Sequence, residues 1–171
     1  MIKKSITLIL ILVVIFTGCR QNPQNLIVED TIETWDVQIN QATVAVGLDG
    51  TTSALKYNGE IVQLEHEHIP AEGNVFLLLD MVIEKTGVGT DVFSWQYAFI
   101  LDNDGNKYWR HRNDSFLEQL GYNRIRGADL TLGETRGKVC FEIPVDVAND
   151  DLLFIYENEH GIIKISLNVI H

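Results

Sequence analysis

Two histidines separated by one residue are the first side chains in the sequence whose types and spacing suit metal chemistry. His66 and His68 flank Glu67 within a polar run. Alternate residues of a β-strand share a face, so one strand would present both imidazoles to zinc or copper, with a third ligand supplied from elsewhere. The alternative is that both histidines are solvated on a polar surface strand. His66 and His68 are therefore candidate metal ligands.

A second candidate for metal binding is an acidic loop. The run Asp102-Asn103-Asp104-Gly105-Asn106 gathers oxygen-bearing side chains, which hard cations such as Ca²⁺ prefer. An EF-hand-type loop needs another acid two residues before Asp102, and that residue is Ile100. The alternative is an Asp-Gly hairpin turn. Asp102 and Asp104 are thus a second pair of candidate metal ligands.

Four arginines lie close together in an otherwise acidic chain. Arg110 and Arg112 flank His111, and Arg124 and Arg126 follow a short predicted helix. The planar guanidinium group recognises carboxylates and phosphates through paired hydrogen bonds. The four arginines are candidate ligand-binding residues for an acidic wall polymer or for the acidic patch of an envelope protein. The alternative is a set of surface ion pairs with the abundant Asp and Glu residues.

Familiar catalytic motifs are missing from the sequence. It contains neither Gly-x-Ser-x-Gly nor His-Glu-x-x-His. The stretch GETRGKV (residues 133–139) is one residue short of a phosphate loop and has Val139 where Ser or Thr would hold magnesium. We therefore expect a binding protein with no catalytic activity and no cofactor. A further alternative is an envelope enzyme whose site residues are scattered along the chain.

The N-terminus has the organisation of an export signal. Lys3 and Lys4 precede eleven residues, Ile6 to Phe16, that are apolar except for Thr7. A membrane-spanning helix needs about 20 apolar residues, so this segment suits a signal peptide better. Phe16-Thr17-Gly18-Cys19 resembles the lipobox of bacterial lipoproteins, with Phe16 in place of the usual Leu. The resemblance implies that Cys19 carries a diacylglycerol thioether and anchors the chain to the extracytoplasmic face of the cell membrane.

Composition limits the remaining chain to one domain. We predict a signal peptide over residues 1–18, a lipid-anchored tether over residues 19–34 and a single domain over residues 35–171. Loss of Lys3 and Lys4 with the signal peptide changes the formal net charge from −11 to −13. Such a charge argues against nucleic acid as a partner. Besides Cys19 the chain has only Cys140, so we expect no disulfide within the domain.

The elements that would position these residues are strands, because apolar residues recur with a period of two. The phase changes near Asn40-Gln41, which predicts a bulge, and Asn58-Gly59 predicts a hairpin turn. Val75 to Glu84 is apolar on both faces and predicts a central strand. We expect one short helix after Ser115, with Ser115 and Glu118 forming a capping box.

Alternation also predicts which side chains face the core. In residues 93–101 we expect an aromatic row to face inward: Phe93, Trp95, Tyr97, Phe99 and Leu101. Val139, Phe141 and Ile143 face inward in a later strand, which places Cys140 on the outer face with Lys138 and Glu142. A hairpin across Asn158 to Gly161 closes the domain. Roughly eight or nine short strands with turns between them favour an antiparallel sandwich.

Three segments carry a resemblance that extends over Trp35 to Val169. They are GNVFLLLDMVIEKTG (residues 73–87), FILDNDGNKY (99–108) and LGETRGKVCFEIP (132–144). In this order they resemble a large family of bacterial secreted and lipoprotein domains of unknown function with a telokin-like fold. The resemblance implies an all-β, antiparallel, immunoglobulin-like β-sandwich with one short helix in a loop. Because these are strand and turn motifs, they imply no catalytic residue.

Overall fold

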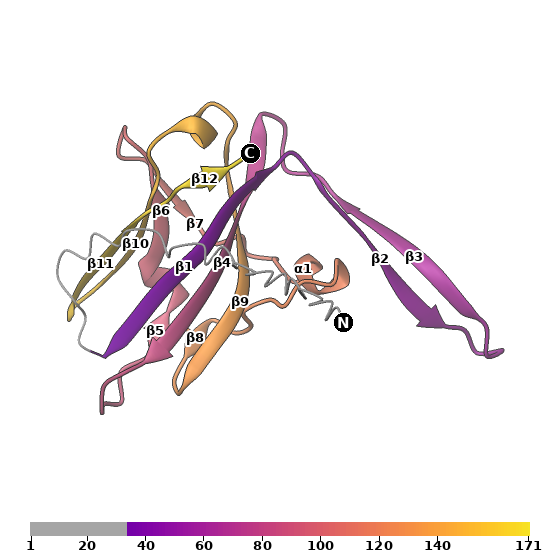
Figure 1. Cartoon of the computed structure of the whole chain (residues 1–171), viewed down its shortest axis with the longest axis horizontal. Coiled ribbons are helices and arrows are strands. Elements are labelled where there is room, and N and C mark those ends of the chain that lie inside the picture. Colours follow the sequence, from indigo (N-terminus) through magenta and orange to yellow (C-terminus); the bar gives the residue numbers. More distant parts are fainter. Residues whose placement is uncertain (1–33) are drawn as a thin grey trace, which may run out of the picture.

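The structure is a computed structural model in which residues 34–171 are described (Figure 1). The predicted signal peptide, Cys19 and the predicted tether as far as residue 33 lie outside the described residues. Within 34–171 the elements are β1 (Trp35–Ala45), β2 (Leu48–Leu55), β3 (Ile61–His68), β4 (Asn74–Lys85), β5 (Phe93–Ser94), η1 (Trp95–Tyr97), β6 (Ala98–Leu101), β7 (Lys107–Trp109), α1 (Phe116–Gln119), β8 (Asp129–Leu130), β9 (Glu134–Pro144), η2 (Val147–Asn149), β10 (Leu153–Asn158), β11 (Gly161–Ser166) and β12 (Val169–Ile170).

Two four-stranded sheets form the body of the domain. One has the strand order β12-β1-β4-β9 and the other β11-β10-β6-β7, and Figure 1 shows them as two layers. All pairs within these sheets are antiparallel except the short pairing of β1 with β12. The predicted all-β, antiparallel, immunoglobulin-like β-sandwich with one short helix in a loop is confirmed.

Strand β4 is central to its sheet, as its apolar sequence predicted. It pairs with β1 on one side and with β9 over eleven residue pairs on the other. The register with β1 shifts between Ile39 and Gln41, at the predicted bulge. The shift changes which side chains of β1 point inward, so that both Ile39 and Ala42 are buried.

The core lies between the two sheets. Val139, Phe141 and Ile143 of β9 are fully buried in it, as predicted, and Phe154 and Ile165 meet them from the opposite sheet. Phe93 stacks on Tyr156 with ring centroids 4.1 Å apart. Burial of these apolar side chains stabilises the sandwich without a disulfide.

The predicted inward aromatic row of residues 93–101 is only partly right. Phe93 and Trp95 are buried in the core, but Tyr97 is 42% exposed while Ala98 and Ile100 are fully buried. The physical reason is the 3₁₀ turn η1, which interrupts the alternation of a strand. After this turn the phase of β6 is the opposite of the predicted one.

Strands β2 and β3 form a separate two-stranded hairpin that extends away from the sandwich (Figure 1). The turn lies at Asn58-Gly59 as predicted, and Gly59 has a positive φ of 84° that favours glycine. Eight consecutive residue pairs join the two strands, from Leu48↔His68 to Leu55↔Ile61. This hairpin is called the arm below.

A second, smaller core covers the outer face of β4 and β9. Leu48, Phe76, Leu78, Phe116, Leu117 and Cys140 are buried together there. Alternation correctly placed Cys140 on the other face of β9 from Phe141. The expectation that Cys140 faces solvent is wrong. Its side chain is fully buried because α1 and the root of the arm pack over this part of the sheet.

Helix α1 begins after Ser115, as predicted, but the predicted capping box does not form. The Ser115 hydroxyl donates to Asn113 Oδ1 at 2.7 Å and makes no capping hydrogen bond. Glu118 instead accepts hydrogen bonds from Arg124 and Arg126. Glu118 therefore serves an ion-pair cluster rather than the helix terminus.

Candidate functional site

The predicted arginine cluster is assembled on the free edge of β9. The Arg110 backbone forms an antiparallel bridge with Phe141, and the His111 N–H donates to the Cys140 carbonyl oxygen at 2.7 Å. Further along the same edge, the Ile125 N–H donates to the carbonyl oxygen of Lys138 at 3.0 Å. Two segments that are distant in sequence thus lie along one strand, which brings Arg110 and Arg124 together.

Arg110 is held by protein groups through each of its guanidinium nitrogens. Nε donates to Asp114 Oδ2 at 2.7 Å, Nη1 donates to the Gly127 carbonyl oxygen at 3.2 Å, and Nη2 donates to the carbonyl oxygen of Ile125. The guanidinium carbon lies 4.5 Å from the centre of the Trp95 ring, within the range of a cation–π interaction. Arg110 therefore shapes the site more than it offers a free cation.

Asp114 and Glu118 link the other arginines. Asp114 is 3% exposed, and its Oδ1 accepts a hydrogen bond from Arg124 Nη1 at 2.8 Å. Glu118 accepts from Arg124 Nε and, with both oxygens, from Arg126. Hydrogen bonds from Arg124 and then from Arg126 lower the pKa of Glu118. The predicted alternative, a set of ion pairs, thus describes three of the four arginines.

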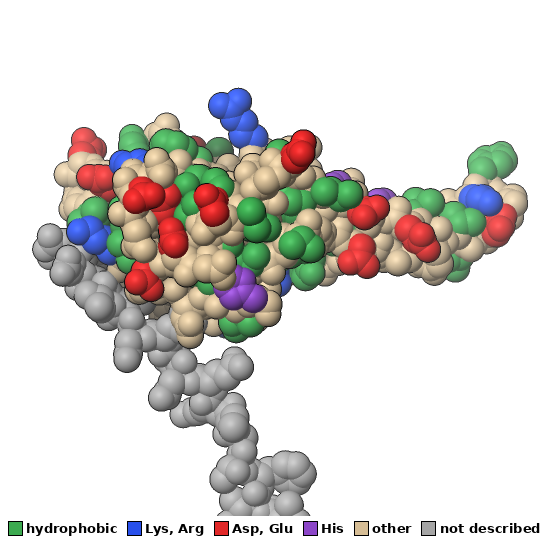
Figure 2. Space-filling view, turned by 90° about the horizontal axis from the view of Figure 1, so that it is seen from above, with side chains coloured by type: hydrophobic (Ala, Val, Ile, Leu, Met, Phe, Trp, Pro, Cys, Tyr) green, Lys and Arg blue, Asp and Glu red, His purple; other side chains and the backbone are tan. Residues whose placement is uncertain are grey.

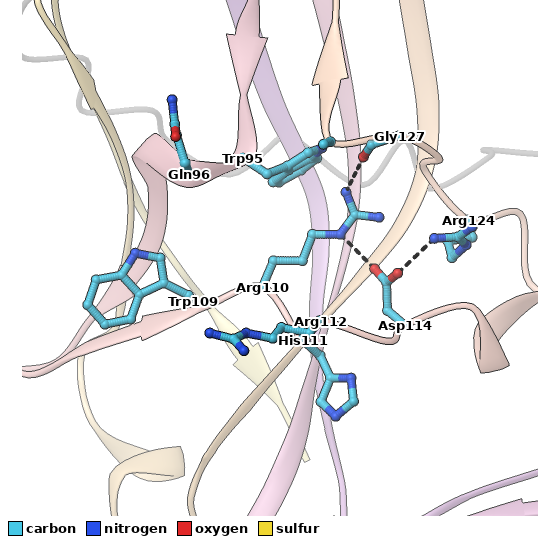
Figure 3. Close-up of a pocket in the computed structure, with 10 residues that line it drawn as sticks. Trp95, Gln96, Trp109, Arg110, His111, Arg112, Asp114, Arg124 and Gly127 are labelled. Carbon is cyan, nitrogen blue, oxygen red and sulfur yellow. Dashed lines mark hydrogen bonds and ion pairs between the residues drawn. The ribbon is translucent and has the colours of Figure 1, made fainter.

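Arg112 differs from the other three arginines. It is exposed, and it makes no hydrogen bond or ion pair with any described residue. Figure 3 shows its side chain pointing away from Asp114, toward the side on which Trp109 lies. Trp109 is itself 55% exposed. An unpaired guanidinium and a solvent-facing indole therefore lie at the same pocket.

These residues line a pocket of about 650 Å³ that is open to solvent. Its lining consists of Trp95, Gln96, Trp109, Arg110, His111, Arg112, Asp114, Arg124, Gly127 and Ala128 (Figure 3). Arg126 does not line it; with Arg124 and Arg136 it borders a neighbouring pocket. The structure thus brings Arg110, Arg112 and Arg124 to one pocket and places Arg126 beside it.

Sequence reasoning missed the groups that complete this pocket. Trp95 and Trp109 form its apolar walls, and Asp114 holds two of its arginines. The separation of Arg110 and Asp114 by four residues was a usable signal for an ion pair. Trp95 comes from a distant segment, and only the tertiary structure brings its ring against Arg110.

The acidic loop forms the hairpin turn between β6 and β7. Asp102 is buried, and its carboxylate accepts hydrogen bonds from the backbone N–H groups of Asp104 and Asn106, from Asn106 Nδ2 and from the Tyr108 hydroxyl. Burial acts to raise the pKa of Asp102, but these hydrogen bonds outweigh it, so the pKa is lowered. The carboxylate is thus already used in the turn, while the Asp104 side chain is exposed.

The two histidines lie on the same face of β3, as predicted from their spacing. Thr52 Oγ1 is 2.7 Å from His66 Nε2, and His68 stacks on Phe116 with ring centroids 4.5 Å apart. Within residues 34–171, no three His, Cys, Asp or Glu side chains gather closely enough to hold a metal ion. Metal binding by His66 and His68 or by Asp102 and Asp104 stays a prediction.

Comparisons with known proteins give structural likeness at low sequence identity. No family model and no curated protein matches the chain. A conserved hypothetical protein from Bacillus anthracis has 14% identity and a TM-score of 0.49, with 82% of this chain and 92% of that chain covered. An uncharacterised β-sandwich protein from Clostridium difficile 630 has 13% identity and a TM-score of 0.46, with coverages of 82% and 89%.

A third solved structure comes from Bacillus subtilis and is described as a "putative lipoprotein". It has 10% identity and a TM-score of 0.49, and it covers 85% of this chain. This chain spans 39% of the length of that protein. In the part of this chain that the structure describes, no helix is both long and apolar enough to cross a membrane.

Proposed function

We propose that the protein is a lipid-anchored, extracytoplasmic binding domain without catalytic activity, whose arginine pocket takes an anionic group. The observation that carries this proposal is Arg112, an exposed guanidinium without a partner among the described residues, in a pocket walled by Trp95 and Trp109. Fork-shaped guanidinium groups suit carboxylates and phosphates. The ligand is a carboxylate or phosphate of an acidic wall polymer or of an envelope protein's acidic patch.

The charge balance of the pocket supports an anionic ligand. Arg110, Arg124 and Arg126 pair with two carboxylates, Asp114 and Glu118, so one positive charge remains before Arg112 is added. The chain as a whole has a formal net charge of −11, so this pocket is a local exception. Such an exception attracts anions to one place on a protein that repels them elsewhere.

Pre-organisation supports the same proposal. Arg110 and Arg124 are fixed by short hydrogen bonds before any ligand arrives, so less side-chain freedom is lost on binding. Trp95 Nε1 is buried at the pocket wall and has no hydrogen-bond partner among the described residues.

The lipid anchor and the family are part of the proposal. The lipobox-like residues Phe16 to Cys19 support a diacylglycerol anchor on Cys19, and therefore a location at the extracytoplasmic face of the membrane. The strand and turn motifs of residues 73–87, 99–108 and 132–144 support membership of the telokin-like family of secreted and lipoprotein domains. No nucleic-acid partner is proposed, because the chain is acidic.

The test is a binding titration of the detergent-solubilised full chain. The probes are a glycerol phosphate oligomer, which stands for a wall polymer, and a polyglutamate peptide, which stands for an acidic protein patch. Arg112→Ala should weaken binding roughly 10- to 100-fold, since a charge-assisted hydrogen bond contributes about 1.5–3 kcal/mol and about 1.4 kcal/mol is tenfold. Raising the salt concentration should weaken binding as well.

The matched control is Lys56→Ala, which removes an exposed cation from the distant tip of the arm. This variant should bind like the parent. Loss of affinity by Lys56→Ala and Arg112→Ala to the same extent would mean that binding follows net charge and not the pocket. Binding of neither probe by the parent chain would contradict the proposal.

A further inference from the structure

The arginine pocket adjoins a second pocket along the 3₁₀ turn η1. The second pocket has a volume of about 470 Å³ and is also open to solvent. The two pockets share Trp95, Gln96 and Ala128 in their linings, and the second extends to Tyr97 and Asp129. Each volume lies within the range of about 300–1,000 Å³ that is usual for ligand sites. The two pockets together are called the groove below.

Three aromatic side chains line the groove. Trp95 is buried, whereas Trp109 is 55% exposed and Tyr97 is 42% exposed. Trp109 is supported before any ligand arrives, because it lies directly opposite Phe99 in the pairing of β6 with β7 and the two ring centroids are 6.2 Å apart. The face of an aromatic ring carries partial negative charge, which attracts the weakly positive C–H groups of a sugar ring. The groove thus offers surfaces on which sugar rings can stack.

The polar side chains of the arginine pocket divide into a paired and an unpaired set. Arg110 and Arg124 are both hydrogen-bonded to Asp114. Arg112 and Gln96 are exposed, and neither side chain makes a hydrogen bond with any residue of 34–171. Figure 3 shows these two side chains on the side of the pocket that lies away from Asp114. A guanidinium suits a carboxylate, while an amide both donates and accepts, which suits hydroxyl groups.

Charge changes sign along the groove. Arg112 leaves an unpaired cation in the first pocket, but the one charged side chain among the described residues that line the second pocket is Asp129. Beyond the groove, Figure 2 shows carboxylates over one face of the body and along the arm. A polymer with an anion on every unit would bring a negative charge beside Asp129, and like charges repel. The groove therefore favours a ligand whose anionic unit is followed by an uncharged one.

We infer that the groove binds an acidic glycan in which an anionic sugar neighbours an uncharged sugar. The carboxylate of the anionic sugar pairs with Arg112, and its ring stacks on Trp109. The uncharged sugar lies over Gln96 and beside Tyr97, and its hydroxyl groups donate to Asp129. This inference rests on the proposed anion pocket and names its ligand. It selects an acidic wall polymer over an acidic protein patch, because glutamate and aspartate side chains have no ring to stack.

Glycans that differ in the spacing of their charges test the ligand class. A hyaluronan oligosaccharide alternates glucuronate with uncharged N-acetylglucosamine, an oligogalacturonate carries a carboxylate on every ring, and a chitin oligosaccharide carries none. In titrations of the detergent-solubilised full chain, the hyaluronan oligosaccharide should bind most tightly, and the chitin oligosaccharide roughly tenfold more weakly. Tighter binding of oligogalacturonate than of hyaluronan, or equal binding of all three, would overturn the inference.

Removal of the negative charge in the second pocket tests the selection. Asp129 is exposed, so Asp129→Asn should leave the fold intact. This variant should narrow the preference for hyaluronan over oligogalacturonate by up to about fivefold, because the exposed like-charge contact is gone. Asp104→Asn removes an exposed carboxylate that does not line the groove, and its preference should equal that of the parent. An equal change in both variants would mean that net charge, and not Asp129, sets the preference.

Replacement of the stacking residue separates this inference from the anion pocket. Trp109→Ala should weaken binding of the hyaluronan oligosaccharide roughly tenfold and change binding of the glycerol phosphate oligomer, which has no ring, by less than about twofold. Trp109→Phe should retain most of the affinity for hyaluronan. Tyr57→Ala, which removes a fully exposed aromatic side chain from the tip of the arm, is the matched control and should bind like the parent.

The two proposals fail in different ways. If Arg112→Ala weakens binding of both probes and Trp109→Ala weakens neither, the anion pocket stands and the glycan inference is overturned. Equal weakening of both probes by Trp109→Ala would also overturn it, since the indole would then recognise no ring. Unchanged binding of both probes by Arg112→Ala would overturn both proposals.

Discussion

Asp102 is a buried carboxylate whose hydrogen bonds all serve the turn between β6 and β7. Its four donors include the Tyr108 hydroxyl at 2.8 Å. Burial, followed by the hydrogen bond to Asp102, raises the pKa of Tyr108 to about 12. The same hydrogen bonds hold the pKa of Asp102 below its ordinary value of 3.8. The ionised carboxylate therefore contributes stability above about pH 4, and this contribution is lost as the pH falls through the lowered pKa.

Replacing this carboxylate by an amide should expose its role. We expect Asp102→Asn to reduce the free energy of unfolding at pH 7 by about 1–3 kcal/mol, because an amide NH₂ would face hydrogen-bond donors. The difference from the parent should shrink as the pH is lowered toward 3, which urea denaturation at several pH values will measure. Asp104→Asn, at an exposed position of the same turn, should stay within about 0.5 kcal/mol of the parent. A pH-independent difference for Asp102→Asn would contradict this account.

Cys140 is the other residue whose environment sets its chemistry. Burial, followed by the nearby charges of Asp114 and Glu142, raises the pKa of its thiol. Because the thiolate is the reactive form, Cys140 should be inert in the folded protein. A maleimide should label it only after unfolding in urea. Rapid labelling of the native Cys19→Ala chain would mean that the second core opens.

At the scale of elements, β9 is the platform on which the candidate site is built. The segment that carries Arg124 and Arg126 lies against β9 at Gly137, where a Cβ atom would be 2.5 Å from the carbonyl oxygen of Asn123. Gly137 also has a φ of +156°, which side-chain-bearing residues rarely adopt. The position of Arg124 thus depends on a glycine in the neighbouring strand.

A methyl group at this position should disturb both the fold and the pocket. We expect Gly137→Ala to lower the free energy of unfolding by about 1–3 kcal/mol, because the 123–125 segment must move away from β9. It should also weaken binding of the glycerol phosphate oligomer, since Arg124 moves with that segment. Gly47→Ala is the control, because its Cβ would meet only an ordinary contact at 3.7 Å. Equal denaturation midpoints for the two variants would show that the segment is not held as described.

At the scale of the whole molecule, acidity and the proposed lipid anchor act in opposite directions. The formal charge of −13 that the chain would have after loss of the predicted signal peptide would repel an anionic membrane surface. An attached diacylglycerol holds the chain at that surface, because each buried methylene contributes about 0.8 kcal/mol. The domain would therefore be retained at the membrane without lying flat on it.

Removal of the proposed lipidation site tests this anchoring. We expect Cys19→Ala to prevent lipid attachment and normal processing of the precursor. Metabolic labelling with a radioactive fatty acid should label the parent chain and leave Cys19→Ala unlabelled. Cys140→Ala is the matched control and should be labelled like the parent. Label on Cys19→Ala, or none on the parent, would show that Cys19 is not the anchor.

The sequence by itself determined the strands and the faces that they bury. Period-two alternation identified β4 as central and Phe141 as buried, and the phase change at Asn40-Gln41 located the bulge. These properties are local, because neighbouring residues of a strand point to opposite faces wherever the strand lies. Alternation failed at residues 95–97, where a 3₁₀ turn reversed the phase without an apolar or polar signal to mark it.

Only the tertiary structure decided what covers the second face of a strand and which distant residues meet. Cys140 is buried because α1 and Leu48 lie over it, and neither is near it in sequence. The four arginines were visible as a group, but their division into three paired cations and an unpaired Arg112 depends on Asp114 and Glu118. Likewise, Asn58-Gly59 predicted a hairpin turn. The hairpin projects from the sandwich because only its root is packed against the rest of the domain. Such contacts depend on packing between segments that are far apart in the chain. The periodicity of residues within one segment contains no information on that packing.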